Sequence, residues 1–493
     1  MSPALFPDST LFSAALAPVP PLQTSASRVL IRLGGVSLLV LTLAGCATFT
    51  KDGGMAPVNA KVASTIGADT VKIASRADAE AAASRVKAIL AKPLTADSAV
   101  QVALLSNRDL QAEYNGLGIS EAAFLEASLP ANPAISVGGA LTEGAFSIER
   151  RLAGSLLALL TLPSRKVIGE KEFEAARYRA IEATFRQAAN TRKAYYRAVA
   201  AQQRASYLEQ ARASADAAAE LTRKLGETGA ASKLDQARAG AFNAETSSQL
   251  ASARLEAGVA REALTRELGL WGADTGYKIP NRLPNLPKKL QTSDQAEAEA
   301  IRKRVDLIAA RLELDALARS LKLNNATRYV SAFDLAGFAN FERTKNDHGE
   351  VEKDHPKGGA LDLELEIPIF DFGETSRRRN AETYMQAVNR FAARAVAIRS
   401  EARSTLQAYR AANDIARQYR ASIVPLRKVI AEEAQLQYNG MLIDVFELLT
   451  TTREGIETNV AAIEAQRDVF LADVDFQSAI IGGGAASTGG RDE

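Results

Sequence analysis

Three carboxylates alternate with apolar residues in one short stretch of the chain. Asp362, Glu364 and Glu366 are interleaved with leucines between Ala360 and Ile367. A period of two is typical of a β-strand, so the acids are expected to share one face and the leucines the other. Acids facing a water-filled lumen would attract cations, and leucines on the outside would suit lipid. The alternative is a soluble antiparallel sheet with one solvated face.

Other chemically reactive side chains are few. The 493 residues include two histidines and one cysteine, which leaves little material for a zinc or copper site. Lys345, His348 and His355 fall in a charged stretch, where the two histidines could suggest metal binding, but we interpret them as solvent-exposed. No phosphate-binding loop, dinucleotide fingerprint, nucleophile elbow or zinc-protease motif is present. The sequence therefore predicts no enzyme, no cofactor and no metal site. A net charge of +2 with interspersed signs gives no nucleic-acid signal.

The single cysteine follows an apolar run. Arg28 and Arg32 precede residues 33–44, and the run ends Leu43-Ala-Gly-Cys46. A basic region, an apolar region and small residues predict a secretory signal peptide. The last four residues resemble the bacterial lipobox, which implies that Cys46 is the acylated N-terminus of a lipoprotein. The alternative is a membrane anchor with an incidental cysteine, for which the run is short.

Long helices are predicted from heptad patterns. Residues 166–226 contain no proline, and apolar residues there step by four and three from Ile181 to Val199. A second such seam runs from Phe391 to Ile423, and Pro425 is expected to kink or break that helix. Each long helix is followed by a turn and a returning helix. The four helices are predicted over 166–226, 232–268, 375–438 and 444–480.

Four strands are predicted, in two pairs. They cover 134–141, 154–162, 328–341 and 360–369, with a polar turn over 142–151 and Pro163 ending the second strand. A shorter helix is expected before each pair, over 95–129 and 296–323, and another over 75–90. Arg304-Val-Asp-Leu echoes Arg108-Asp-Leu, so the chain contains an internal repeat. Four strands cannot close a barrel alone, since small barrels need about eight, and we expect oligomerisation.

A corner follows the acidic strand. In Pro368-Ile-Phe370-Asp-Phe-Gly373, the proline ends strand pairing and the glycine permits a sharp turn. This corner, the Asn132-Pro133 pair and the two repeats resemble TolC-type outer-membrane efflux channels over residues 94–480. The resemblance implies a mainly α fold with a transmembrane β-barrel. Each repeat would supply a short helix, two barrel strands and a long coiled-coil hairpin. Three protomers would close a barrel of about 12 strands and an α-helical tube.

The resemblance also assigns a role to the hairpin turns, which would meet an adaptor protein and narrow the closed pore. The implied tip and gate residues are Gly229, Asp235, Tyr438, Gly440, Asp444 and Glu447. Both glycines are expected to adopt φ > 0. In relatives the second turn's acids lie about six residues after its glycine, but Asp444 follows Gly440 by four. The alternative is that Asp444 only caps the returning helix.

The expected organisation has six parts. They are a signal peptide 1–45, a lipid-anchored tether 46–93, a first repeat 94–278, a Pro-rich linker 279–293, a second repeat 294–481 and a flexible tail 482–493. The resemblance implies an outer-membrane, homotrimeric channel of a Gram-negative bacterium, with its helices in the periplasm. It would export small solutes passively, together with a periplasmic adaptor and an inner-membrane transporter, whose class and substrate stay open. The alternative is a periplasmic coiled-coil structural or adaptor lipoprotein without a pore.

Overall fold

The computed structural model describes residues 48–142, 145–287, 295–344 and 355–484. The chain divides into two units, residues 1–48 and 49–493, and all helices and strands of the described ranges belong to the second unit. Cys46, the signal peptide, Lys345, His348 and the tail beyond residue 484 lie outside the described residues. Within the described ranges, no helix is long and apolar enough to cross a membrane.

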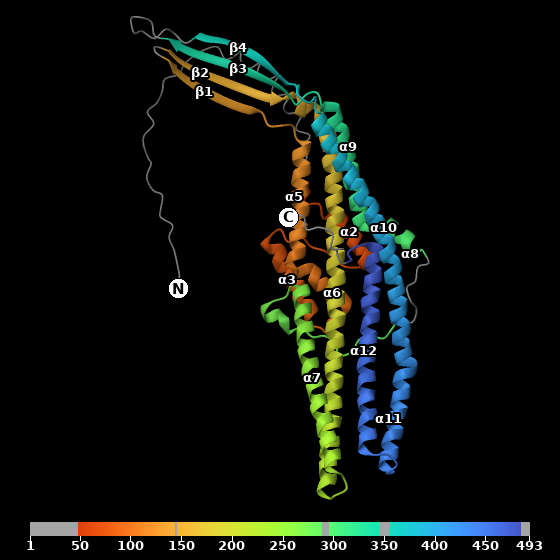
Figure 1. Ribbon diagram of the computed structural model, residues 1–493. Coiled ribbons are helices and arrows are strands. Elements are labelled where there is room, and N and C mark those ends of the chain that lie inside the picture. The colour runs from red at the N-terminus through yellow and green to blue at the C-terminus, as the bar shows by residue number, and fades with distance from the viewer. Residues whose placement is uncertain (1–47, 143–144, 288–294, 345–354, 485–493) are drawn as a thin grey trace, which may run out of the picture. The chain divides into compact units, whose positions relative to one another are not determined.

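Four antiparallel strands form one sheet at one end of the long helices (Figure 1). The strands are β1 (Ala134–Thr142), β2 (Ala145–Ser155), β3 (Ala332–Thr344) and β4 (His355–Glu366), in the order β1-β2-β3-β4. The two repeats therefore meet where β2 pairs with β3. Strands β1 and β4 are the sheet edges, each paired on one side within the described chain.

The prediction for the second strand was wrong. Strand β2 ends at Ser155, and the apolar run after it begins the helix α6 (Leu156–Glu227), which contains Pro163 in its interior. The polar stretch expected as a turn supplies most of β2. An unbroken apolar run fits a buried strand and a helix equally well, so its period could not decide between them. Strand β3 also starts later than predicted, at Ala332, because residues 328–331 form a turn between α9 (Val305–Thr327) and the strand.

The long helices form two hairpins that pack side by side. Helix α6 returns through α7 (Lys233–Leu268), and α10 (Glu374–Gln418) with α11 (Val424–Asn439) returns through α12 (Val445–Ile481). The hairpins meet along α6 and α12, where the rings of Tyr196 and Phe470 stack 4.7 Å apart. The predicted seams are confirmed as core, since Phe185, Tyr195 and Tyr409 are buried.

A π-helical turn interrupts the second hairpin, where the sequence predicts a kink. It covers Tyr419–Ile423, directly before Pro425 in the first turn of α11. Proline has no N–H for the carbonyl of Ala421, so the regular hydrogen-bond ladder cannot continue there. The N–H of Val424 donates instead to the carbonyl of Tyr419, which is the wider π-type spacing.

The shorter helix predicted before each pair of strands is in fact two helices. The first splits into α4 (Ala96–Ser106) and α5 (Arg108–Ser128), and the second into α8 (Ala296–Lys303) and α9 (Val305–Thr327). The breaks have nearly the same backbone angles, with φ −68° and ψ 121° at Asn107 and φ −62° and ψ 119° at Arg304. Asn107 therefore corresponds to Arg304, one residue away from the predicted match with Arg108.

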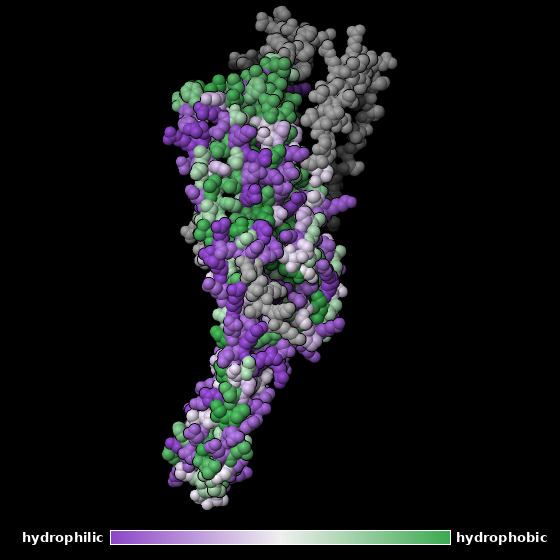
Figure 2. Space-filling view, turned by 90° about the vertical axis from the view of Figure 1, so that its right-hand side faces the viewer, coloured by the Kyte–Doolittle hydropathy of each residue, from purple (hydrophilic) through white to green (hydrophobic). Residues whose placement is uncertain are grey.

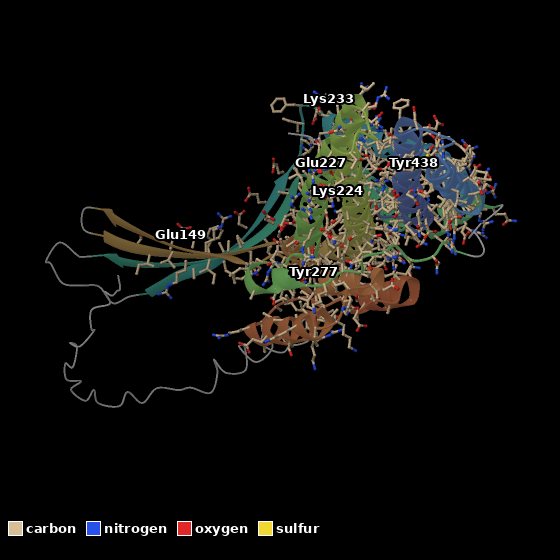
Figure 3. The ribbon with its side chains drawn as sticks, turned by 90° about the horizontal axis from the view of Figure 1, so that it is seen from below. Glu149, Lys224, Glu227, Lys233, Tyr277 and Tyr438 are labelled. Atoms are coloured by element: carbon tan, nitrogen blue, oxygen red, sulfur yellow. The ribbon has the colours of Figure 1, made fainter. Side chains whose placement is uncertain are left out.

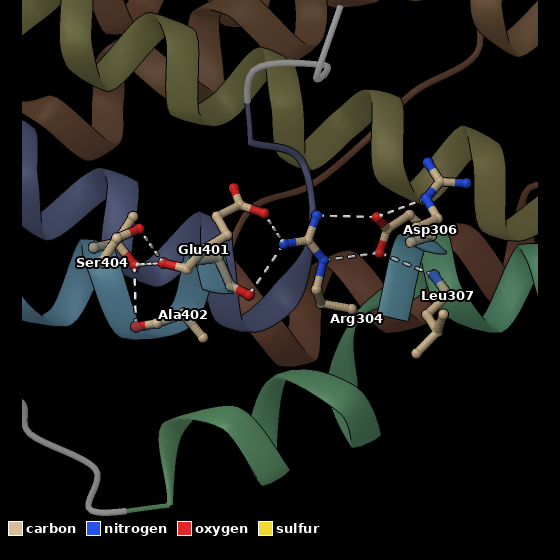
Figure 4. A network of polar contacts seen from close by, with 9 residues as sticks. Arg304, Asp306, Leu307, Glu401, Ala402 and Ser404 are labelled. Carbon is tan, nitrogen blue, oxygen red and sulfur yellow. Dashed lines mark hydrogen bonds and ion pairs between the residues drawn. The ribbon is translucent and has the colours of Figure 1, made fainter. Parts of the chain in front are cut away.

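A buried ion-pair network stabilises the break between α8 and α9 at Arg304 (Figure 4). Arg304 donates from Nε and Nη2 to the two carboxylate oxygens of Asp306, at 3.0 Å each, and from Nη1 to Glu401 at 2.5 Å. The Arg304 and Asp306 side chains are only 8% and 3% exposed. Nη1 also donates to the carbonyl of Ala479 near the end of α12. The network therefore joins α9, α10 and α12. At the first break, Asn107 instead makes a neutral bond to the carbonyl of Glu267.

The expected tether is more structured than predicted. It contains α2 (Ala56–Ile66), which the sequence did not predict, and α3 (Arg76–Leu90), which it did. Met55, Val58 and Val62 are buried in the same core cluster as Phe173. From Phe49 onward this segment is thus packed against the helices. A short 3-10 helix, η1 (Gly272–Gly276), precedes the Pro-rich connection.

Candidate functional site

The two faces of the sheet differ in chemistry. Side chains alternate along each strand, and the strand register fixes which residues of neighbouring strands share a face. The charged side chains described on one face are Glu149, Arg151, Asp334, Asp362, Glu364 and Glu366. The described side chains of the other face include Ile135, Val137, Leu152, Leu335, Leu361, Leu363 and Leu365, with Arg150 among them. The three acids predicted to share a face do so.

The apolar face is exposed. Leu361 is 81% exposed, Ile135 is 76% exposed, and Leu335 is still 39% exposed. Hydrophobic residues gather at the end that carries the strands (Figure 2). Monomeric soluble proteins rarely expose so many apolar side chains together, so this face is suited to lipid or to another apolar surface.

The opposite face is acidic, with five described carboxylates against one guanidinium. Arg151 Nη2 lies 3.7 Å from Glu364 Oε2, and the guanidinium lies over the ring of Phe338. Asp334 pairs directly with Glu364 in the strand register, and its Oδ1 is buried without a hydrogen-bond partner in the described chain. Like charges directly opposite each other destabilise a sheet, and Arg151 offsets part of that repulsion.

The sequence prediction missed three of these charged residues. Glu149 and Arg151 were placed in a turn because β2 was misplaced. Asp334 stands between Phe333 and Leu335, in the same alternation that identified the acids of β4. Applying a period of two to this stretch would have found it.

Local hydrogen bonds stabilise the corner after β4. The Phe372 N–H donates to the Pro368 carbonyl at 2.8 Å, and the Asp371 carboxylate accepts the Gly373 N–H at 2.9 Å. Gly373 has φ 71°, and a β-carbon there would lie 2.4 Å from the carbonyl oxygen of Arg328. Only glycine fits this position. Phe370 is 98% exposed, so its ring is free to contact surroundings outside the chain.

The first hairpin turn ends α6 in a Schellman motif. The Ala230 N–H donates to the Leu225 carbonyl at 2.8 Å, and the Gly229 N–H to the Gly226 carbonyl at 3.1 Å. Gly229 takes the left-handed position with φ 77°, as predicted.

The second hairpin turn repeats this motif with a different residue at its centre. The Leu442 N–H donates to the Gln437 carbonyl at 2.8 Å, and the Met441 N–H to the Tyr438 carbonyl at 3.0 Å. Met441 is the left-handed residue, with φ 57°, whereas Gly440 has φ −81°. The prediction that Gly440 adopts φ > 0 was wrong. Met441 is also 93% exposed.

The tip acids cap the returning helices. Ser232 caps α7, and hydrogen bonds from Ser232 to the Asp235 carboxylate lower the pKa of Asp235. Asp444 caps α12 by accepting the Glu447 N–H at 2.8 Å. The two turns have the same spacing when each is counted from its left-handed residue, Gly229 or Met441. The helix cap, Ser232 or Asp444, comes three residues later. The next acid, Asp235 or Glu447, comes six residues later. Glu447 therefore corresponds to Asp235, and the four-residue spacing of Asp444 is explained by its capping position.

The hairpins are also tied to each other near their turns. Arg238 of α7 lies 4.5 Å from the ring centroid of Phe446 on α12, and Arg453 pairs with Glu245 at 2.5 Å. Figure 3 views the hairpins from this end, with Tyr438 on one hairpin and Glu227 on the other. The predicted residues therefore form two separate groups, one on the sheet and one at the turns. No described group of three or more histidine, cysteine or acidic residues is arranged to hold a metal ion.

No protein-family model matches the chain, and no curated protein matches it. Solved structures do. The CmeC outer membrane channel of Campylobacter jejuni is 19% identical with a TM-score of 0.68, over 80% of this chain and 87% of that one. A membrane protein from Pseudomonas aeruginosa is 19% identical with a TM-score of 0.67, over 78% and 92%. The open MtrE outer membrane channel of Neisseria gonorrhoeae is 17% identical with a TM-score of 0.62, over 78% and 88%. The chain therefore has the fold of outer membrane channels.

Proposed function

We propose that this protein is the outer-membrane channel of a tripartite efflux system and passively exports small solutes. The observation that carries the proposal is the two-faced sheet. Its exposed leucines suit lipid, and its acidic face suits a water-filled lumen. Helical hairpins continue from the sheet (Figure 1), and the chain shares its fold with two outer membrane channels.

The channel would be a homotrimer. The described part of one chain supplies four strands with edges at β1 and β4, too few to close a barrel. Three copies would give a barrel of about 12 strands, with no edge left unpaired. The helical hairpins of the three chains would then form the wall of a tube in the periplasm.

The hairpin turns are proposed to meet a periplasmic adaptor, which would link the channel to an inner-membrane transporter. Exposed Met441 and Leu442 support this part of the proposal, because apolar side chains at a turn favour a protein partner. Asp235 and Glu447, at corresponding positions in the first turns of α7 and α12, would contribute acids to the closed end of the tube. Cys46 would carry the lipid anchor at the outer membrane, and loss of fatty-acid labelling in Cys46→Ser would test that point.

A planar-bilayer recording tests the channel proposal directly. The purified full chain should give stepwise single-channel currents with cation preference, and mass measurement in mild detergent should find trimers. A periplasmic structural or adaptor lipoprotein would give neither. Monomers with no conductance at any protein concentration would rule out the channel.

A further inference from the structure

A polar cavity of about 570 Å³ lies beneath the Pro-rich connection, away from both the sheet and the hairpin turns. The connection closes it on one side. The Leu283 N–H donates to Gln203 Oε1 on α6 at 2.8 Å, and Gln466 on α12 donates to the carbonyl of Pro284 at 2.7 Å. These bonds hold the connection across the two hairpins. The volume is that of a pocket for a small organic molecule.

The lining of this cavity is rich in groups that both donate and accept hydrogen bonds. Its six carboxamides are Gln203, Gln210, Asn281, Asn285, Asn459 and Gln466. Tyr207 and Tyr419 add two aromatic rings. Each hydroxyl of a sugar is likewise both donor and acceptor, and sugar rings present flat C–H faces to aromatic side chains.

The cavity is also positively charged. Arg282 and Arg420 line it, and no described carboxylate does. Within the described part of the chain, Arg420 makes one long hydrogen bond of 3.4 Å, to the neutral side chain of Asn285. A guanidinium without a carboxylate partner there, next to carboxamides, favours an anionic group on the ligand.

The helix beside the cavity is irregular and contains an unpaired amide. The π-helical turn Tyr419–Ile423 brings Tyr419 and Arg420 to the lining, and such turns are frequent at functional sites. Asn413 is fully buried, and neither its Oδ1 nor its Nδ2 has a hydrogen-bond partner in the described chain. Ala416, three residues further on, lines the cavity.

We infer that this cavity binds a saccharide that carries an anionic group. Gln210, Asn281 and the carboxamide atoms that are not already bonded within the chain hold the hydroxyls, the tyrosines contact the ring faces, and Arg282 with Arg420 binds the carboxylate or phosphate. A peptide fits less well, because extended peptides are usually bound along a strand edge or an apolar groove, and this cavity has neither. The inference does not depend on the channel function, since the cavity is contained within one chain.

Isothermal titration of the full chain in detergent tests the inference with two matched probes. Cellobiuronic acid and cellobiose differ only in one carboxylate. We expect the acid to bind about tenfold more tightly, as one charge-assisted contact allows. Arg420→Gln should bring the two affinities together. Arg399→Gln is the control, because Arg399 is exposed on α10 and does not line the cavity.

Equal affinity of both probes for the unmodified chain would overturn the anionic part of the inference. Absence of binding by both would overturn the site itself. If Arg420→Gln does not fold, as judged by thermal unfolding, Arg282→Gln on the connection provides the same test. A tenfold preference that survives loss of both arginines would also contradict the inference.

Discussion

Met441 occupies a backbone conformation that its side chain opposes. A left-handed residue with a β-carbon is less stable by about 1–2 kcal/mol than one without. Met441→Gly should therefore stabilise the second hairpin by about 1 kcal/mol, and Gly229→Ala should destabilise the first by a similar amount. Hydrogen exchange of the turn amides measures both effects.

Gly440→Ala provides the matched control for this comparison. Gly440 has φ −81°, and a β-carbon there would make only ordinary contacts at 3.5 Å. Its replacement should change exchange very little. A larger loss for Gly440→Ala than for Gly229→Ala would mean that the left-handed residue has been assigned wrongly. The stability of the turn does not favour methionine at this position, which agrees with the proposed contact of Met441 with a partner.

Glu182 should make stability depend on pH. Burial first, and the nearby Asp306 second, raise the pKa of Glu182 above its usual 4.5. A raised pKa in the folded state means that the folded protein holds this proton more tightly than the unfolded chain. The resulting stabilisation is present below the unfolded-state pKa and is lost as pH rises through the folded-state pKa.

Glu182→Gln should thus raise the melting temperature near pH 7 and leave it nearly unchanged near pH 4. Thermal unfolding at the two pH values is the measurement. Glu172→Gln, on the exposed side of the same helix, is the control and should show no such difference. A uniform increase for Glu182→Gln at both pH values would contradict burial as the cause.

At the scale of elements, what the sequence predicted depended on how distinctive each period was. The seams of α6 and α10 repeat over many turns, and both were found. Strand β4 was found from its alternation of acid and leucine. The run after Ser155 has no period, so helix and strand could not be separated there. The breaks at Asn107 and Arg304 were missed because neither glycine nor proline marks them, and tertiary contacts hold both breaks in place.

The same limit applies to the candidate site. Residues on the acidic face were predictable from one strand at a time, but the pairing of Asp334 with Glu364 depends on the sheet register. The left-handed role of Met441 depends on backbone hydrogen bonds, and sequence alone favoured the adjacent glycine. Arg151 on β2 contacts Glu364 on β4, across the intervening strand β3. The two residues come from different repeats, so no local sequence pattern reveals their contact.

The break at Arg304 should depend strongly on its ion pairs. Arg304→Met would leave the carboxylate of Asp306 buried without its main partner, which typically costs about 3–5 kcal/mol. Adding Asp306→Asn should recover a substantial part of that loss, because it removes the unpaired charge. Chemical unfolding of the single and double variants measures the coupling. An equal loss of stability in the single and the double variant would show that the ion pair contributes through packing rather than through charge.

At the scale of the whole molecule, the two faces of the sheet should respond differently to substitution. If the leucine face meets lipid, Leu363→Arg should cost about 2–4 kcal/mol near the bilayer midplane and block insertion. The double variant Glu364→Gln, Glu366→Gln should still insert, because water solvates both forms. It removes two carboxylates per chain and leaves Arg151 less neutralised, so the reversal potential should shift toward anions. Membrane fractionation of the first variant and bilayer recordings of the second measure the two effects.

An inverted sheet would exchange these outcomes, since neighbouring residues of a strand face opposite sides. Normal insertion of Leu363→Arg together with unchanged selectivity of the double variant would exclude a lipid-facing role for the leucines and a lumen for the acids.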